Sequence, residues 1–534
     1  MAITTLKKKI LKRCLKKRIL YLINLTFKLE QILNKKPIVI IILFLLGIIS
    51  SFSLPPYNYF FINFITFPFL FYILVDNTNK NLLNNFFIGW IYGFGFFLSN
   101  LYWISNSLKF DESFEHLIFL SILLIPFLLS LFYGLFSYLL KFFGLKMDFS
   151  SILIFSLMLS IIEYIRGTIF GGFPWNLISF SIIEYISSLQ ILSLIGTYSF
   201  NLLVITFYSL PIIILFDIKR IEKFTILFSA IIILFLNIYY GNNRIEQIEQ
   251  LEKKIISPSI KLVSPDFNIE RFFIKEPIEK KLNELIEISY PLNKDFLLIY
   301  PEGITNMGEL DQLDNDFSEI TNKISNNSKI ILGFSLNDGE KIFNSLGVFN
   351  NEFILEDIYK KNKLVPFGEY LPLEKFLSKF GLKKITYGYR SFSSSNERNI
   401  IKVNSISILP LICYEIIFSG KLNINKSDYD FILNISEDGW FGNTVGPIQH
   451  FSHSIFRSVE EGKDVLRVAN NGVTAHVSLN GRINEKLSTT EKGSIEINSV
   501  SKVFPTLFSI YGNKIFFCLI FFYTSLIFFL KKYK

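Results

Sequence analysis

The stretch LPLICYEIIF (residues 409–418) decides the fold, because it places an apolar run directly before Cys413 in the most polar half of the chain. An apolar run of this length that ends at a reactive side chain is typical of a buried strand in an α/β domain, where functional groups lie at strand ends. Taken alone, a cysteine in such a run is more often a small core residue than a nucleophile. The rest of the chain must decide between these two interpretations.

The composition predicts a membrane protein with several spans. Half of the 534 residues are hydrophobic and 59 are Phe, which is more apolar than a soluble protein of this length normally is. The net charge of +9 is concentrated in the basic N-terminal segment and the terminal KKYK, beside apolar runs. This placement indicates cytoplasmic flanks of membrane helices and contact with membrane lipids, and no nucleic-acid partner is expected.

Eight apolar segments are candidates for membrane helices, since a spanning helix needs roughly 20 apolar residues. The first is expected to be retained, because no A-x-A-like cleavage site follows it. The segments are residues 37–54, 57–75, 86–107, 117–142, 150–166, 188–216, 224–241 and 515–530.

The positive charges predict the orientation, because Lys and Arg in short loops stay in the cytoplasm. Lys219, Arg220 and Lys223 follow the sixth segment and Lys80 follows the second, so both termini are expected inside. We therefore predict a basic cytoplasmic N-terminus (1–36), seven spans (37–241), an extracytoplasmic domain (242–514) and an eighth span with its tail (515–534).

The polar region is predicted to form one α/β layered domain, because strand-like runs alternate with helix-length segments. The helix-length segments are 278–289 and 448–465, and the Ser-rich stretch 390–399 is expected to be a mobile loop. The strand-like runs are 259–264, 295–300, 329–335, 405–413, 428–436 and 473–479.

Cys413 gains a chemical interpretation from its compartment and its partners. A cysteine without a disulfide partner is unusual outside the cytoplasm. A thiol of pKa about 8.5 needs a base or a cation to react as thiolate. Glu302 in YPEGIT (300–305) and the lysines and Glu369 of KKNKLVPFGEYLPL (360–373) are candidates, although each alone is more often a solvated surface residue.

These motifs carry a resemblance to a known family. PEG at Glu302, KxxLVPFGEYLPL from Lys361 and ICYE at Cys413 resemble the nitrilase superfamily, whose catalytic set is Glu, Lys and Cys. The membrane layout resembles the apolipoprotein N-acyltransferase family within it, and the resemblance covers nearly the whole chain from about residue 37. Five further stretches look like that family's pattern: RGTIFGGFPWN (166–176), FNS (343–345), NISEDGWFG (434–442), GPIQH (446–450) and NNGVTA (470–475).

The resemblance implies a fold and a set of roles. The fold would be an eight-helix membrane domain joined to an α-β-β-α sandwich. Cys413 would be the nucleophile, Glu302 the general base and Lys361 the oxyanion stabiliser, with backbone N–H near Tyr414 as a helper; the KxxL spacing selects Lys361 over Lys360 and Lys363. Glu369 would support the acid/base network, and the implied substrate-binding residues are Tyr414, Glu415, Trp440 and Trp175.

The implied reaction is acyl transfer without a cofactor, as the last step of lipoprotein maturation. A phospholipid would donate an acyl chain to Cys413, and the amino group of a diacylglyceryl-modified apolipoprotein cysteine would accept it. The catalytic domain would lie on the periplasmic side of the bacterial inner membrane. Two alternatives are a membrane-tethered amidase of the same superfamily, which hydrolyses a C–N bond, and a scaffold that only binds lipoproteins.

Several residues depart from the family pattern or carry other interpretations. VSPDFNIERFF (263–273) lacks the family's glutamines and has Phe273 at the expected Trp position, and Glu437 stands where Asn is more usual. His450 and His453 have helical spacing for a metal pair, but the sequence offers no evident third ligand, so no metal is expected. The other two cysteines are expected to be incidental; they are Cys14 and Cys518.

Overall fold

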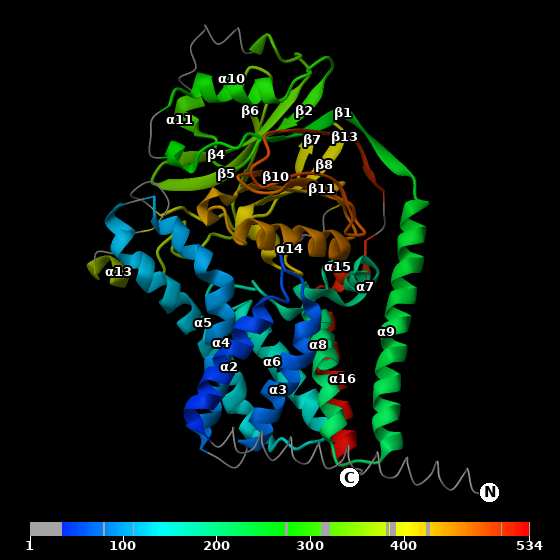
Figure 1. Cartoon of the computed structure of the whole chain (residues 1–534). Helices are drawn as coiled ribbons and strands as arrows, with labels where there is room; N and C mark the ends of the chain where they lie inside the picture. The colour runs from blue at the N-terminus through cyan, green and yellow to red at the C-terminus, as the bar shows by residue number, and fades with distance from the viewer. Residues whose placement is uncertain are drawn as a thin grey trace, which may run out of the picture.

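The protein, seen in a computed structural model, consists of a bundle of apolar helices and an α/β domain stacked on one end of it (Figure 1). The described residues are 35–77, 81–110, 112–272, 276–310, 321–380, 384, 391–422, 428–502 and 505–532. Most of the basic N-terminal segment, together with Cys14, Lys80 and Phe273, therefore lies outside the described residues.

The chain is a multi-pass membrane protein. Among the described residues, six helical segments are long and apolar enough to cross a membrane. They contain α4 (Leu82–Leu101), α5 (Ile118–Leu140), α6 (Phe149–Arg166), α8 (Leu192–Ser209), α9 (Arg220–Glu249) and α16 (Lys514–Lys532).

The first two of the eight predicted spans form shorter helices than expected. They are α2 (Lys36–Ser51) with 16 residues and α3 (Asn63–Asp76) with 14. The turn between them contains Pro55 and Pro56, which lack the N–H that a continuing helix needs. The sixth predicted span is also shorter at its start, because a separate short helix, α7 (Ile186–Leu189), precedes α8.

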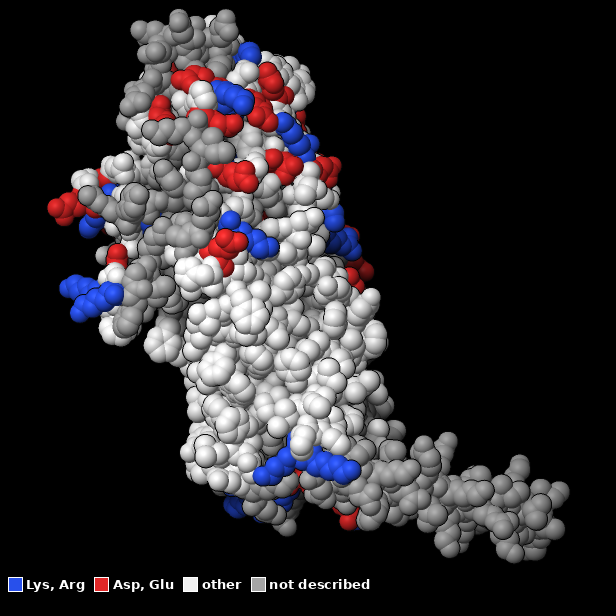
Figure 2. All heavy atoms as spheres, turned by 60° about the vertical axis from the view of Figure 1, so that its left-hand side comes forward, with Lys and Arg blue, Asp and Glu red and all other residues white. Residues whose placement is uncertain are grey.

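The surface of the bundle suits a lipid environment. Figure 2 shows a broad band without charged side chains over the helices, below the charged α/β domain. The start of α9 and the end of α16, with Lys531 and Lys532 in its last turn, lie at the end of the bundle remote from that domain (Figure 1).

The α/β domain contains two mixed sheets. The first has the order β13-β1-β2-β4-β5-β6, with β3 beside β4, and the second has the order β12-β11-β10-β9-β8-β7. Strands β1, β2 and β4 are parallel in the first sheet, and β8, β9 and β10 are parallel in the second. The first sheet comprises β1 (Lys253–Ser264), β2 (Phe296–Ile299), β3 (Thr305–Asn306), β4 (Lys329–Asp338), β5 (Lys341–Phe349), β6 (Leu355–Lys360) and β13 (Gly493–Ser501). The second comprises β7 (Ile401–Val403), β8 (Ile406–Ile412), β9 (Phe431–Glu437), β10 (Val465–Asn470), β11 (Thr474–Val477) and β12 (Ile483–Leu487).

Four layers result, which confirms the predicted sandwich. The inner faces of the sheets share one core that includes Leu297, Ile408 and Leu433. Helix α10 (Ile278–Ile288) covers the outer face of the first sheet, and α14 (Gly446–Glu461) covers that of the second. Because both faces are covered, the central strands are apolar throughout instead of alternating.

Helix α14 also joins the domain to the bundle. Apolar side chains of α14, the second sheet and the membrane helices form one continuous core. Thr197 of α8 donates two hydrogen bonds of 2.6 Å to the buried Glu460 carboxylate, one from its backbone N–H and one from its hydroxyl. The short helices are α11 (Met307–Leu310), α13 (Glu374–Leu377) and α15 (Leu507–Tyr511).

Glu461 at the end of α14 is expected to make stability depend on pH. Burial and the neighbouring Glu460 raise the pKa of Glu461 from 4.5 to about 7. The folded state therefore binds a proton more tightly than the unfolded state, and this stability is complete below pH 4.5 and lost as the pH rises through 7. A rise of this size corresponds to a loss on the order of 3 kcal/mol. Glu461→Gln should raise the melting temperature at pH 8 by a few degrees and change it little at pH 4.5.

Thermal unfolding in detergent at pH 4.5 and pH 8 measures the melting temperatures of Glu461→Gln and the wild type. Glu284→Gln is the matched control, because Glu284 forms an exposed ion pair with Lys492. The difference in melting temperature between this variant and the wild type should be the same at pH 4.5 and pH 8. An equal effect of Glu461→Gln at both pH values would contradict the assignment.

Candidate active site

The predicted base, cation and nucleophile come from three strand ends. Glu302 follows β2 by three residues, Lys361 follows β6 directly, and Cys413 follows β8 directly. Carboxyl ends of parallel strands are the usual place for reactive groups in α/β folds. The turn at Glu302 packs so closely on β4 that a Cβ on Gly333 would lie 2.5 Å from Glu302 Cα, so only glycine fits there.

Glu302, Lys361 and Glu369 form one buried ionic cluster. Lys361 Nζ lies 3.3 Å from Glu302 Oε1 and 3.0 Å from Glu369 Oε1. The backbone N–H of Glu437 donates to Glu302 Oε2 at 2.9 Å, and that of Val365 donates to Glu369 Oε2 at 2.8 Å. Two carboxylates therefore share one ammonium in this cluster.

Asn344 of β5 completes this cluster, and sequence reasoning gave it no role. Its Nδ2 donates to Glu302 Oε1 and to Glu369 Oε1, both at 2.7 Å. Its backbone carbonyl also accepts the N–H of Lys361 at 2.8 Å. The FNS stretch (343–345) was a signal for this residue, but only the pairing of β5 with β6 places it between the two carboxylates.

Lys361 is held as a cation. Burial alone would lower the pKa of Lys361, but the Glu302 and Glu369 carboxylates beside it raise the pKa well above its ordinary value. Lys361 is 1% exposed, and Ser395 N–H donates to the Lys361 carbonyl at 2.9 Å. Residues 391–399 of the Ser-rich stretch form no helix or strand, and this hydrogen bond joins them to the backbone of Lys361.

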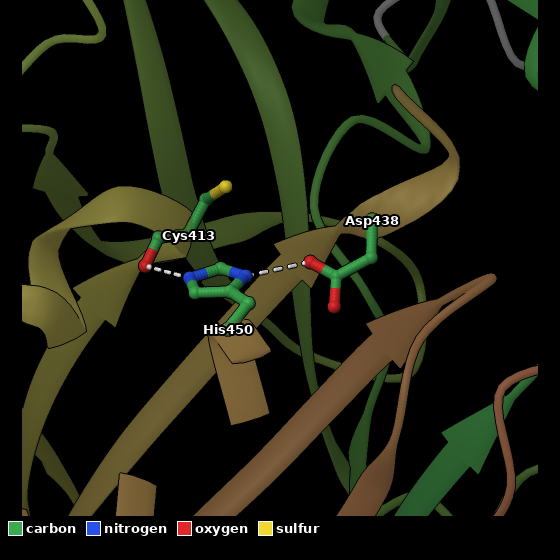
Figure 3. A group of neighbouring side chains, drawn as sticks. All are labelled: Cys413, Asp438 and His450. Carbon is green, nitrogen blue, oxygen red and sulfur yellow. Dashed lines mark hydrogen bonds and ion pairs between the residues drawn. The ribbon is translucent and has the colours of Figure 1, made fainter. Parts of the chain in front are cut away.

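Cys413 occupies a strained turn between β8 and the short helix η10 (Cys413–Ile417). Its φ of 49° lies in the left-handed region that non-glycine residues rarely adopt. Two side chains hold its carbonyl oxygen: His450 Nε2 at 3.3 Å and Asn434 Nδ2 at 3.4 Å. Figure 3 shows the Cys413 sulfur pointing away from the His450 ring, so the imidazole contacts the backbone of Cys413 and not its thiol.

The surroundings of Cys413 favour its thiol form over the thiolate. Burial and the Glu302 carboxylate raise the pKa of Cys413 well above its ordinary value, while Lys361 acts in the opposite direction. A protonated cysteine needs a base at the moment of attack. Among the neighbouring carboxylates, Glu302 contributes most to the raised pKa of Cys413.

His450 has a partner network of its own. His450 Nδ1 lies 2.9 Å from Asp438 Oδ1, and Arg467 Nη2 lies 2.7 Å from Asp438 Oδ2. Potential metal-ligand atoms of Cys413, Asp438 and His450 lie within 4.8 Å of one another, a group that does not include His453. Both ring nitrogens of His450 and both oxygens of Asp438 already have protein partners, and His453 packs against Phe180 and Trp175 instead.

Glu415, predicted to contact substrate, lies in a network of buried protein contacts. It is fully buried, and Arg398 forms a 2.8 Å ion pair with Oε1. The same oxygen accepts the backbone N–H of Asn362 and of Lys363 at 3.0 Å, and Oε2 accepts that of Ile412 at 2.9 Å. Glu415 therefore ties the turn after Lys361 to the strand end before Cys413.

Tyr414 and Trp175 lie where the domain meets the bundle. The Tyr414 hydroxyl donates to the carbonyl of Gly172. Trp175 is 2% exposed, stacks on His450 with ring centroids 5.4 Å apart, and donates from Nε1 to Gln449 at 3.0 Å. The Trp175 ring is therefore enclosed by protein, and its role in binding substrate stays a prediction.

Trp440 lies in the short helix η11 (Asp438–Phe441) and is half-buried. Its ring stacks on Phe272, with centroids 5.5 Å apart, and meets the edge of Phe110 from the bundle at 5.8 Å. Trp440 thus forms an aromatic link between the α/β domain and the membrane helices.

Models of known protein families match both the helical part and the α/β part of the chain. The model of the apolipoprotein N-acyltransferase N-terminal domain matches residues 46–210, and that of carbon-nitrogen hydrolase matches residues 321–501. The apolipoprotein N-acyltransferase of Rickettsia typhi is 32% identical over 492 residues, which cover 89% of this chain and 94% of that protein. That of Rickettsia prowazekii is 31% identical over 489 residues, with the same coverage.

Solved structures resemble the α/β domain. Nit3 of Saccharomyces cerevisiae, a member of branch 10 of the nitrilase superfamily, aligns at 16% identity with a TM-score of 0.33, over 46% of this chain and 91% of that one. The family assignment comes from the full-length relatives. Since these share up to 32% of their residues with it over nearly its whole length, the chain belongs to the apolipoprotein N-acyltransferase family and is an acyltransferase.

Proposed function

We propose that this protein moves an acyl chain from a membrane phospholipid to the α-amino group of the diacylglyceryl-modified cysteine of an apolipoprotein, through a thioester on Cys413. The observation that carries the proposal is the placement of Cys413 beside the Glu302–Lys361–Glu369 cluster, on a domain anchored in the membrane at both ends. We also propose that this domain lies on the periplasmic side of the bacterial inner membrane, because Lys219, Arg220 and the basic end of α16 mark the opposite side.

In the first half of the reaction, Glu302 takes the thiol proton while Cys413 sulfur attacks the ester carbonyl of the phospholipid. The negative charge that forms on the carbonyl oxygen is stabilised by the Lys361 ammonium. When the C–O bond breaks, Glu302 returns the proton to the leaving alkoxide. The products are a lysophospholipid and the acylated Cys413.

In the second half, the α-amino nitrogen of the lipoprotein attacks the thioester carbonyl. Glu302 takes a proton from the nitrogen, and Lys361 again stabilises the oxyanion. The C–S bond breaks and the proton passes to the Cys413 sulfur, which regenerates the thiol. No cofactor is needed, because the donor ester and the acceptor amine supply every atom of the product.

Anchoring the α/β domain in the membrane suits a reaction in which both substrates are lipids. Removing a lipid from the bilayer costs about 0.8 kcal/mol for each CH₂ group, so a soluble domain would face a large barrier twice in each cycle. In this chain Tyr414, the neighbour of the nucleophile, already contacts Gly172 of the bundle. Substrates held in the membrane could therefore reach the site without leaving it.

Intact-mass measurement tests this proposal. Purified protein incubated with phospholipid should gain the mass of one acyl chain, and a diacylglyceryl-cysteine lipopeptide should then remove it and become triacylated. Loss of the adduct to water rather than to an amine would favour a hydrolase of the same superfamily, and no adduct at all would favour a scaffold. Cys518→Ser is the matched control and should keep the adduct, since Cys518 lies in α16.

A further inference from the structure

The two segments in which the sequence departs from the family pattern meet in space. Arg271 belongs to VSPDFNIERFF and Glu437 to NISEDGWFG, and their side chains form an ion pair between Arg271 Nη2 and Glu437 Oε2. The two side chains are 5% and 1% exposed. A buried pair of this kind behaves as a unit, because loss of one partner leaves the other charge unpaired in a place that water does not reach.

Glu437 connects this pair to Glu302. Its backbone N–H donates to Glu302 Oε2 at 2.9 Å. Its side chain fixes that backbone: Oε1 accepts the N–H of Gly439 at 2.9 Å, and Oε2 accepts Asn470 Nδ2 at 2.9 Å. The Glu437 carboxylate therefore holds the end of β9 at the position from which its N–H orients the proposed base.

Arg271 connects the pair to Trp440. The guanidinium lies over the Phe272 ring at 4.5 Å, and that ring stacks on Trp440. The Phe272 ring also packs against Gly303, where an added Cβ would lie 2.8 Å from the ring. Phe272 is thus held between Trp440 and the residue that follows Glu302.

We propose that the Arg271–Glu437 pair is a positioning pair that couples the orientation of Glu302 to the Phe272–Trp440 stack. The pair touches neither substrate nor the reacting atoms, and it acts through the Glu437 N–H on one side and the Phe272 ring on the other. The inference rests on the proposed function, in which Glu302 is the base for acylation of Cys413.

The test compares Arg271→Met, Glu437→Gln and the double variant in a single-turnover assay of Cys413 acylation with phosphatidylethanolamine in detergent micelles. Each single variant should acylate about tenfold more slowly than the wild type, since a small displacement of a catalytic group costs one to two orders of magnitude in rate. The double variant should be no slower than the slower single variant, because the two residues act as one unit. It also contains no unpaired buried charge, so it remains informative if a single variant folds poorly.

Trp440 fluorescence supplies a second readout, which reports the Phe272–Trp440 stack independently of acylation. The Trp440 emission, taken as the difference between each protein and the same protein with Trp440→Phe, should shift to the red in each single variant as the stack on Phe272 loosens. The matched control is the exposed Lys492–Glu284 pair, in which Lys492→Met and Glu284→Gln should change neither readout.

Three results would overturn the inference: single-variant rates within twofold of the wild type, rate effects that simply multiply in the double variant, or an unchanged Trp440 emission. A wild-type protein that forms no thioester would instead reject the proposed function. The emission measurement needs no substrate, so it still tests the coupling in that case.

Discussion

Cys413→Ala is expected to abolish formation of the acyl-enzyme and to lower the rate of lipopeptide acylation by at least 10⁴-fold. Cys413 is the described cysteine beside the Glu302–Lys361–Glu369 cluster, and its strained backbone presents the sulfur at the end of β8. The remaining donors could still bind substrate, but no neighbouring atom can replace the sulfur as the carrier of the acyl chain. Intact mass after incubation with phospholipid, and triacylation of a labelled lipopeptide, measure the two effects.

The fold of this variant can be checked independently. Alanine at a φ of 49° keeps the same backbone strain as cysteine, since both carry a Cβ, so the melting temperature should change little. An adduct of one acyl chain on Cys413→Ala, or retained triacylation, would show that another residue carries the chain. Cys518→Ala is the control variant. It should leave both the acyl adduct and the triacylation of the lipopeptide unchanged.

The sequence pointed to side chains that the structure brings together, because each lies at the end of a recognisable apolar run or in a distinctive motif. Glu302, Lys361 and Cys413 come together with Glu369 once the strands align. Their supporting groups were not predictable in the same way. Asn344 lies in the middle of a strand, and its function depends on the register of β5 against β6, which no local pattern encodes.

The same limit applies to charged residues far apart in sequence. Arg398 is a member of a polar, Ser-rich loop, yet it pairs with the fully buried Glu415. Glu437 was visible only as a departure from a pattern and Arg271 only as part of the segment VSPDFNIERFF, and their pairing is a fact of tertiary structure. Local sequence suggests that such residues are exposed, and only the packing of two distant segments buries them.

The fold was predictable where burial on both faces makes a run apolar. Strands β2, β8 and β9 fall on predicted strands for this reason. Strand β12 did not, because it is mostly exposed and reads as a polar segment, INEKL. Strand β10 begins at Val465, which the sequence placed in a helix; the helix ends earlier because Gly462 takes a left-handed conformation.

Lys361→Met is expected to lower the rate of Cys413 acylation by about 10³-fold. The ammonium has two functions that methionine cannot perform. It stabilises the oxyanion in both halves of the proposed reaction, and it separates two buried carboxylates that both lie within 3.3 Å of Nζ. Without the ammonium, the two buried carboxylates lose the cation that each of them contacts. Single-turnover thioester formation, followed by mass spectrometry, measures the loss.

Lys360→Met is the matched control, since it makes the same change one residue earlier. Lys360 pairs with Asp338 at 2.9 Å, and the Asp338 side chain is 61% exposed. Exposed pairs of this kind contribute about 0–1 kcal/mol to stability and nothing directly to the site, so the acylation rate should stay within about twofold of the wild type. If Lys360→Met and Lys361→Met reduced the rate equally, general loss of positive charge at the end of β6 would explain both, and the assignment of Lys361 as the oxyanion stabiliser would be wrong.

If Lys361→Met alone were slow but still formed a full adduct at long times, the nucleophile and base would be intact, and the loss would belong to charge stabilisation in the transition state.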